Sequence, residues 1–222
     1  PDSSEIPTQH FAATAVIMVT MSWRYSDSQL TTLRALLQRA NWDNLQGASK
    51  DRWFIRDMPA TCPTLHRFLL HNIIGNKDTL LRGLLRALHP QHTFYSLGAL
   101  KTATSGDSTM QGWHTDYTKS PVWPSLPHLM PFSVIITLED ECVFCYIDAN
   151  TGCKIELIVP PFHFVRFMGN VVHCGGKNRQ DREVYRIFMY CTSCPGHIPI
   201  DSFFAVEIDE NKCACGGSCF KN

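Results

Sequence analysis

The residues of this chain that could do chemistry lie in the stretch QGWHTDY, 111–117, where His114 precedes Asp116 by two positions. In an extended strand the side chains alternate between faces, so this imidazole and this carboxylate would point to the same side. Both groups bind first-row transition metals, but two ligands hold a reactive metal poorly. The pair therefore predicts a third ligand, and we expect another histidine on a neighbouring strand.

His173 is the candidate for that ligand. It lies in FMGNVVHCGG, residues 167–176, after a Gly-Asn turn that would return the chain as a strand. A histidine in such a strand is more often a packing or surface residue, but here glycines flank it and strand-like segments fill the interval from Asp116. His114, Asp116 and His173 would form a two-histidine, one-carboxylate facial triad, which suits Fe(II) and leaves coordination positions open.

The elements that must position these residues begin near residue 92, where the pattern changes to short β-type runs separated by turn residues. Strands are predicted at 93–104, 110–117, 132–138, 142–147, 153–159, 163–168, 171–174 and 183–191. Eight short strands at this spacing predict a jelly roll, that is, a double-stranded β-helix. The proline-rich segment 118–131 is predicted to be a long loop beside the metal-binding strand.

The first ninety residues have a different pattern, with leucines at helical spacing. We predict helices at 28–40, 63–75 and 78–88, an irregular segment at 42–57 and a buried strand at 15–21. The expected fold class is therefore α+β, a single domain over residues 1–222. It would comprise a mainly helical N-terminal support (1–91), a jelly-roll core (92–192) and a Cys-rich C-terminal extension (193–222).

The ordered set of motifs resembles the Fe(II)- and 2-oxoglutarate-dependent dioxygenase superfamily over about residues 92–192. The matching features are His114-x-Asp116, the turn and strand 169–173, which are similar to the superfamily's Gly-Asp-x-x-His, and the following strand REVYRIFMY, 182–190. The resemblance implies Fe(II) on the three ligands, with 2-oxoglutarate and O2 as co-substrates. It also implies succinate and CO2 as co-products, with ascorbate as a possible reductant.

The resemblance further implies that a basic residue on the last strand binds the distal carboxylate of 2-oxoglutarate. Arg186 is our choice, because its guanidinium fork can bind a carboxylate through two hydrogen bonds. Arg182 is the rival, closer to His173 in sequence and at the mouth of the strand. Phe188 stands where the family often has a hydroxyl residue, so another polar group must assist, and Tyr95 is a candidate.

The cysteines suggest a second, structural site. The chain has 10 Cys, and a zinc site could use Cys191 and Cys194 together with two of the last three, because a C-x-x-C pair supplies two thiolates at suitable spacing. Disulfides or free thiols fit equally well. The compartment therefore stays open, with a soluble, intracellular protein slightly favoured. The last three cysteines are Cys213, Cys215 and Cys219.

Charge and hydropathy narrow the partners. Twenty Lys+Arg balance twenty Asp+Glu, so no broadly basic surface is indicated, although a local patch for nucleic acid is not excluded. The longest apolar run, 11–21, is shorter than the roughly 20 residues that span a bilayer. The leading hypothesis is an oxygenase that hydroxylates or demethylates a polypeptide or a small molecule. The alternatives are an oxidase of methylated nucleobases, a non-catalytic metal-binding jelly roll and an interaction module. The oligomeric state is undetermined.

Overall fold

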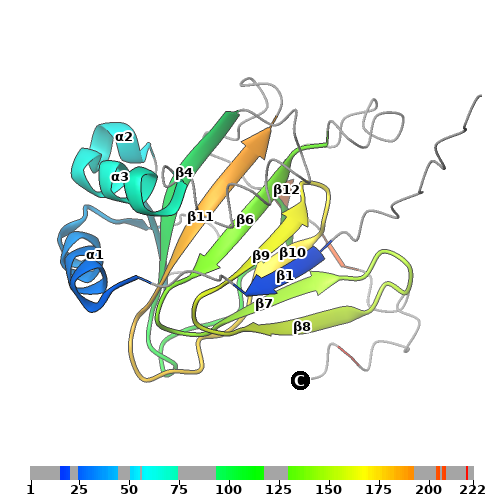
Figure 1. Ribbon diagram of the computed structural model, residues 1–222. Coiled ribbons are helices and arrows are strands. Elements are labelled where there is room, and N and C mark those ends of the chain that lie inside the picture. Colours follow the sequence, from blue (N-terminus) through cyan, green and yellow to red (C-terminus); the bar gives the residue numbers. More distant parts are fainter. Residues whose placement is uncertain are drawn as a thin grey trace, which may run out of the picture.

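Two antiparallel sheets form the core of the protein (Figure 1). The computed structural model describes residues 16–20, 25–44, 51–55, 57–74, 94–117, 130–192, 204–205, 207–208 and 219. The large sheet has the order β1-β9-β6-β11-β4-β3-β2 and the small sheet β12-β5-β10-β7-β8. The strands are β1 (Val16–Thr20), β2 (Asp43–Asn44), β3 (Arg52–Ile55), β4 (Phe94–Thr102), β5 (His114–Thr115), β6 (Phe132–Thr137), β7 (Cys142–Ile147), β8 (Lys154–Val159), β9 (His163–Met168), β10 (His173–Gly175), β11 (Val184–Thr192) and β12 (Phe204–Ala205).

The strands from β4 to β11 form the double-stranded β-helix, because consecutive strands cross repeatedly between the two sheets. Each of them overlaps one of the eight predicted segments, and β7 and β9 have the predicted bounds. The jelly-roll core is therefore confirmed. The largest difference is β5, which has 2 residues where the sequence predicted a strand over 110–117. The chain bends directly after Thr115, so the regular alternation of side chains ends there.

The described N-terminal residues include helices at two of the three predicted places, 28–40 and 63–75, and one short helix that was not predicted. They contain α1 (Asp27–Arg39), α2 (Met58–Thr61), α3 (Pro63–Leu69) and the π-helical turn η1 (Leu70–Ile74). These helices lie beside the β4 side of the large sheet (Figure 1). No described helix is long and apolar enough to cross a membrane. The predicted helix over 78–88 lies outside the described residues.

The prediction of an irregular segment over 42–57 was wrong, since β2 and β3 lie within it. β3 pairs with β4 from Arg52 opposite Thr102 to Ile55 opposite Ala99. Three of its four residues, Trp53, Phe54 and Ile55, favour strands, but a run of four is too short to show a period, so the pairing with β4 is what identifies it as a strand. Together with β1, these strands place three N-terminal segments in the large sheet. A mainly helical N-terminal support is therefore not confirmed.

The helix α1 shows how local sequence and packing agree. Ser26 and Gln29 form a capping box at its N-terminus, which satisfies backbone N–H groups that the helix leaves unpaired. One face of the helix buries Leu30, Leu33 and Leu37. These leucines belong to the same buried cluster as Ile136 of β6, so the helix and the large sheet share one core.

This shared core predicts the effect of truncating Ile136, whose side chain is fully buried. Ile136→Ala should lower the free energy of unfolding by about 2–5 kcal/mol, because it removes packed apolar volume. Ile158→Ala is the matched control, since Ile158 is 41% exposed on β8, and it should cost less than about 1 kcal/mol. Urea denaturation measures both, and equal losses would contradict the assignment of the core.

Candidate metal centre and co-substrate pocket

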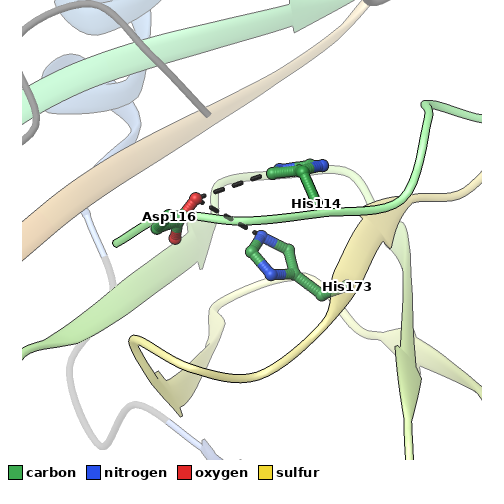
Figure 2. A group of neighbouring side chains, drawn as sticks. All are labelled: His114, Asp116 and His173. Carbon is green, nitrogen blue, oxygen red and sulfur yellow. Dashed lines mark ion pairs between the residues drawn. The ribbon is translucent and has the colours of Figure 1, made fainter. Parts of the chain in front are cut away.

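The structure brings His114, Asp116 and His173 together (Figure 2). His114 of β5 and His173 of β10 stand directly opposite each other in the antiparallel pair, and Asp116 lies in the bend after β5. The Asp116 Oδ1 atom is 3.5 Å from Nε2 of His173 and 3.9 Å from Nε2 of His114. The potential ligand atoms all lie within 4.8 Å of one another, and the three side chains are buried.

Backbone carbonyls set the tautomer of both histidines. The Nδ1 atom of His114 is 2.8 Å from the Gly112 carbonyl oxygen, and that of His173 is 3.0 Å from the Val171 carbonyl oxygen. A carbonyl oxygen can only accept, so each Nδ1 carries the proton and each Nε2 keeps its lone pair. Those lone pairs lie on the side of Asp116, and this is the orientation that metal-ligating histidines adopt.

The protonation states also suit a metal. Burial lowers the pKa of His114 to about 4, with a smaller contribution from the neighbouring His173. Burial likewise lowers the pKa of His173 to about 4. Both imidazoles are therefore neutral near pH 7, as metal ligands must be.

Asp116 completes the set through a contact from the other sheet. Burial raises the pKa of this carboxyl, but Ser133 of β6 donates a hydrogen bond of 2.5 Å to its Oδ2 atom. That bond leaves Oδ1 facing the two histidines. A carboxylate buried between two neutral imidazoles gains most from a bound cation, so the donor set fits a divalent metal.

Trp113 and Tyr117 lie beside the ligands His114 and Asp116 in the sequence, and both are packing residues. Trp113 packs in a cluster with Val143, Cys145 and Cys174. Tyr117 does not share that environment. Its ring meets Tyr190 edge-on with centroids 5.8 Å apart, because the bend after Thr115 redirects the chain toward the large sheet.

Arg186 lies on the face of the large sheet that the metal centre also touches. Its strand β11 pairs with β6, so that Tyr190 stands opposite Ser133 and Arg186 opposite Thr137. Alternation then places Arg186, Phe188 and Tyr190 on the same face as Ser133, which contacts Asp116. Arg186 is 4% exposed and donates a 2.6 Å hydrogen bond from Nη2 to the Thr102 hydroxyl.

Arg186 also lines a small cavity. The other lining residues include Thr102 and Cys142, together with Asn178 from the loop after β10. Thr102 and Ser133 are two hydroxyl residues that the sequence analysis missed. Each lies at an inward position of a correctly predicted strand, so the alternation of that strand was an available signal.

The other clamp candidates lie elsewhere. Arg182 is exposed and forms an ion pair with Asp140 at the surface. Tyr95 lies within β4, where its backbone pairs with Cys191, but its side chain is outside the described residues. The structure therefore does not bring Arg182 together with Arg186.

The predicted zinc cysteines are only partly described. Cys191 is buried in β11, five positions after Arg186 and thus on the opposite face of the sheet. The Cys219 sulfur accepts a hydrogen bond of 3.1 Å from the Lys154 backbone N–H. The remaining candidates lie outside the described residues, so zinc stays a prediction. They are Cys194, Cys213 and Cys215.

The chain matches no protein-family model and no curated protein by sequence. Its structure is similar to an oxidoreductase of the 2OG-Fe(II) oxygenase family from Burkholderia pseudomallei, with a TM-score of 0.57, 12% identity and coverage of 86% of this chain and 90% of that chain. The fold is that of the 2OG-Fe(II) oxygenases. It is also similar to HygX from Streptomyces hygroscopicus with nickel and 2-oxoglutarate bound, with a TM-score of 0.56, 11% identity and coverage of 88% and 92%. A prolyl-4-hydroxylase from Pseudomonas putida gives a TM-score of 0.51, 9% identity and coverage of 82% and 94%.

The geometry predicts that single histidine substitutions remove metal binding. His114→Ala and His173→Ala should each weaken Ni(II) or Fe(II) binding by at least about 100-fold. Loss of a residue that only hydrogen-bonds a ligand already costs up to about 100-fold, and loss of the ligand itself should cost no less. Anaerobic calorimetry measures this. His71→Ala, at an exposed position of η1, should bind metal like the wild type. Unchanged metal affinity in both the His114→Ala and the His173→Ala variant would contradict the assignment of the metal centre.

Ser133→Ala tests the contact from the large sheet. Without the hydroxyl, Asp116 loses the hydrogen bond that orients its carboxylate, so metal affinity should fall about 10-fold. Ser105→Ala is the control, because Ser105 bonds Asp181 at the surface. An affinity equal to that of the wild type would mean that Ser133 does not orient the ligand.

Proposed function

We propose that this protein is an Fe(II)- and 2-oxoglutarate-dependent oxygenase that hydroxylates or oxidatively demethylates a polypeptide or a small molecule. The observation that carries the proposal is the buried triad of His114, Asp116 and His173, with both imidazoles in the ligating tautomer. Two histidines and one carboxylate that leave positions open are typical of non-haem Fe(II) oxygenases. The nickel and 2-oxoglutarate bound in the similar HygX structure support the same cofactors here.

The residues of the triad would hold the metal, and bound Fe(II) with 2-oxoglutarate would supply the oxidation, giving succinate and CO2 as co-products. Ascorbate would serve as a reductant that keeps the metal in its Fe(II) state. The protein's own contribution is to orient the ligands, bind the co-substrate and exclude water. Phe167 and Phe144 contribute to the last task, because their ring centroids lie 4.4 and 5.5 Å from that of His173.

Arg186 would bind the distal carboxylate of 2-oxoglutarate. Three observations support this role: its inward position on β11, its burial, and the absence of any ion pair to it among the described residues. Its Nε atom is buried without a hydrogen-bond partner there. A buried guanidinium in this state gains a charge-assisted hydrogen bond when a carboxylate arrives. Thr102, which bonds Arg186, would supply the hydroxyl that Phe188 cannot.

The surroundings of Arg186 also weigh against a non-catalytic barrel. A metal-binding jelly roll without a carboxylate co-substrate would bury this cation with a hydrogen bond to Thr102 but with no ion pair among the described residues to offset its charge. An interaction module built on the Cys-rich extension, and an oxidase of methylated nucleobases, have no comparable support among the described residues.

Turnover of the co-substrate tests the function. With Fe(II), ascorbate and O2, the purified protein should slowly convert 2-oxoglutarate to succinate even without a substrate, and His114→Ala and His173→Ala should abolish this. Arg186→Met should raise the KM for 2-oxoglutarate about 10- to 100-fold, the worth of one hydrogen bond to a charged group. Succinate formation measures each variant.

Arg182→Met separates the two candidate arginines. Its guanidinium is at the surface, so its KM should stay within about 2-fold of the wild-type value. A larger effect from Arg182→Met than from Arg186→Met would transfer the clamp to Arg182. Persistent turnover in both histidine variants would contradict the proposed function itself.

A further inference from the structure

Arg52 is a second buried guanidinium beside Arg186, on a strand that the sequence did not reveal. It opens β3, where its backbone pairs with Thr102 of β4, and its side chain is 2% exposed. Its Nη1 atom donates to the Thr102 hydroxyl at 3.2 Å. Its Nη2 atom lies 2.9, 3.1 and 2.7 Å from the carbonyl oxygens of Thr109, Gly175 and Gly176.

The Thr102 hydroxyl therefore stands between two cations. It accepts from Arg52 at 3.2 Å and from Arg186 at 2.6 Å. A hydroxyl oxygen has two lone pairs and one proton, so both acceptor positions are used and only the O–H remains. The two arginines thus turn Thr102 into a hydrogen-bond donor.

The positive charges around Thr102 are offset only in part within the described residues. Neither Arg52 nor Arg186 makes an ion pair there, and the Nε atom of each is buried without a hydrogen-bond partner. Burial, and secondly the charge of Arg186, lower the pKa of Arg52 to about 10. The charge of Asp51 offsets part of this shift, but its carboxylate oxygens bond Thr109, at 2.5 Å to the backbone N–H and 3.2 Å to the hydroxyl. Two adjacent buried cations of this kind are best stabilised by an anion.

We propose that Arg52 is a second cationic residue of the distal-carboxylate site, acting beside Arg186 and through Thr102. This inference rests on the proposed function. Arg52 adds positive charge where the distal carboxylate of 2-oxoglutarate binds, and it holds the Thr102 hydroxyl so that its proton is donated to that carboxylate.

The same guanidinium connects this site to the metal centre. Gly175 belongs to β10, the strand of His173, and both its carbonyl oxygen and that of Gly176 accept from Arg52. A Cβ atom at Gly175 would lie 2.7 Å from the Arg52 Nη1 atom, so a larger residue there would have to displace the guanidinium from its present position. Arg52 therefore fixes the clamp relative to the strand that carries a metal ligand.

Binding of two matched ligands to the Ni(II)-loaded protein tests the role without turnover. 2-Oxoglutarate carries the distal carboxylate, and 2-oxovalerate has the same carbon chain without it. Calorimetry should show that Arg52→Met weakens 2-oxoglutarate binding about 10-fold and leaves 2-oxovalerate within about 2-fold, because a charge-assisted contact is lost with the carboxylate partner only. Arg52→Lys, which keeps the charge, should recover part of the loss.

Thr102→Val gives an independent variant of nearly unchanged shape, and it should show the same selective loss of 2-oxoglutarate binding. Arg34→Met, on the exposed side of α1, should bind both ligands like the wild type. Equal weakening of both ligands by Arg52→Met and Thr102→Val would show a purely structural role and overturn the inference.

Two further outcomes separate this inference from the function on which it rests. Loss of 2-oxoglutarate binding in Arg186→Met, with none in Arg52→Met, Arg52→Lys or Thr102→Val, would overturn the role of Arg52 and leave the proposed function standing. No binding of 2-oxoglutarate by the wild-type protein loaded with Ni(II) would overturn both.

Discussion

The site depends on one pair of residues in one strand register, His173 opposite His114. A slip of one residue would turn either imidazole to the other face of the small sheet and remove it from Asp116. With only 2 residues, β5 cannot hold this register alone. The flanking backbone helps: Gln111 N–H bonds the Gly175 carbonyl at 2.9 Å on one side of the pair, and Ile147 N–H bonds the Val172 carbonyl at 2.9 Å on the far edge of β10.

The two sheets contribute different parts of the site. The small sheet and its bend supply the three metal ligands, whereas the large sheet supplies Ser133, Arg186 and Thr102. The packing of one sheet on the other therefore sets the distance between the metal centre and the carboxylate clamp. The Ser133–Asp116 hydrogen bond and the hydrogen bond from Arg52 to the Gly175 carbonyl are two contacts that join these groups across the sheets.

The similarity to solved oxygenase structures, at 9–12% identity for the three compared above, shows that the architecture persists when most side chains have changed. Such a fold hosts many reactions, so the substrate must be argued from the pocket rather than from the barrel. The described residues present a buried positive charge at Arg186, which lines a small cavity, and aromatic rings beside His173. Both features concern the metal and the co-substrate, which is why they support a reaction type rather than a substrate.

The sequence by itself determined the eight core strands and named the three residues that the structure brings together. Strand period and turn residues are local properties, and His114, Asp116 and His173 stand out by type and spacing within them. Only the tertiary structure shows which residues these elements contact. It pairs β3 with β4, brings the Ser133 hydroxyl to Asp116, and places Arg52 and Arg186 on the same Thr102 hydroxyl. These contacts join residues far apart in the chain through sheet pairing and packing, for which no local pattern in the sequence exists.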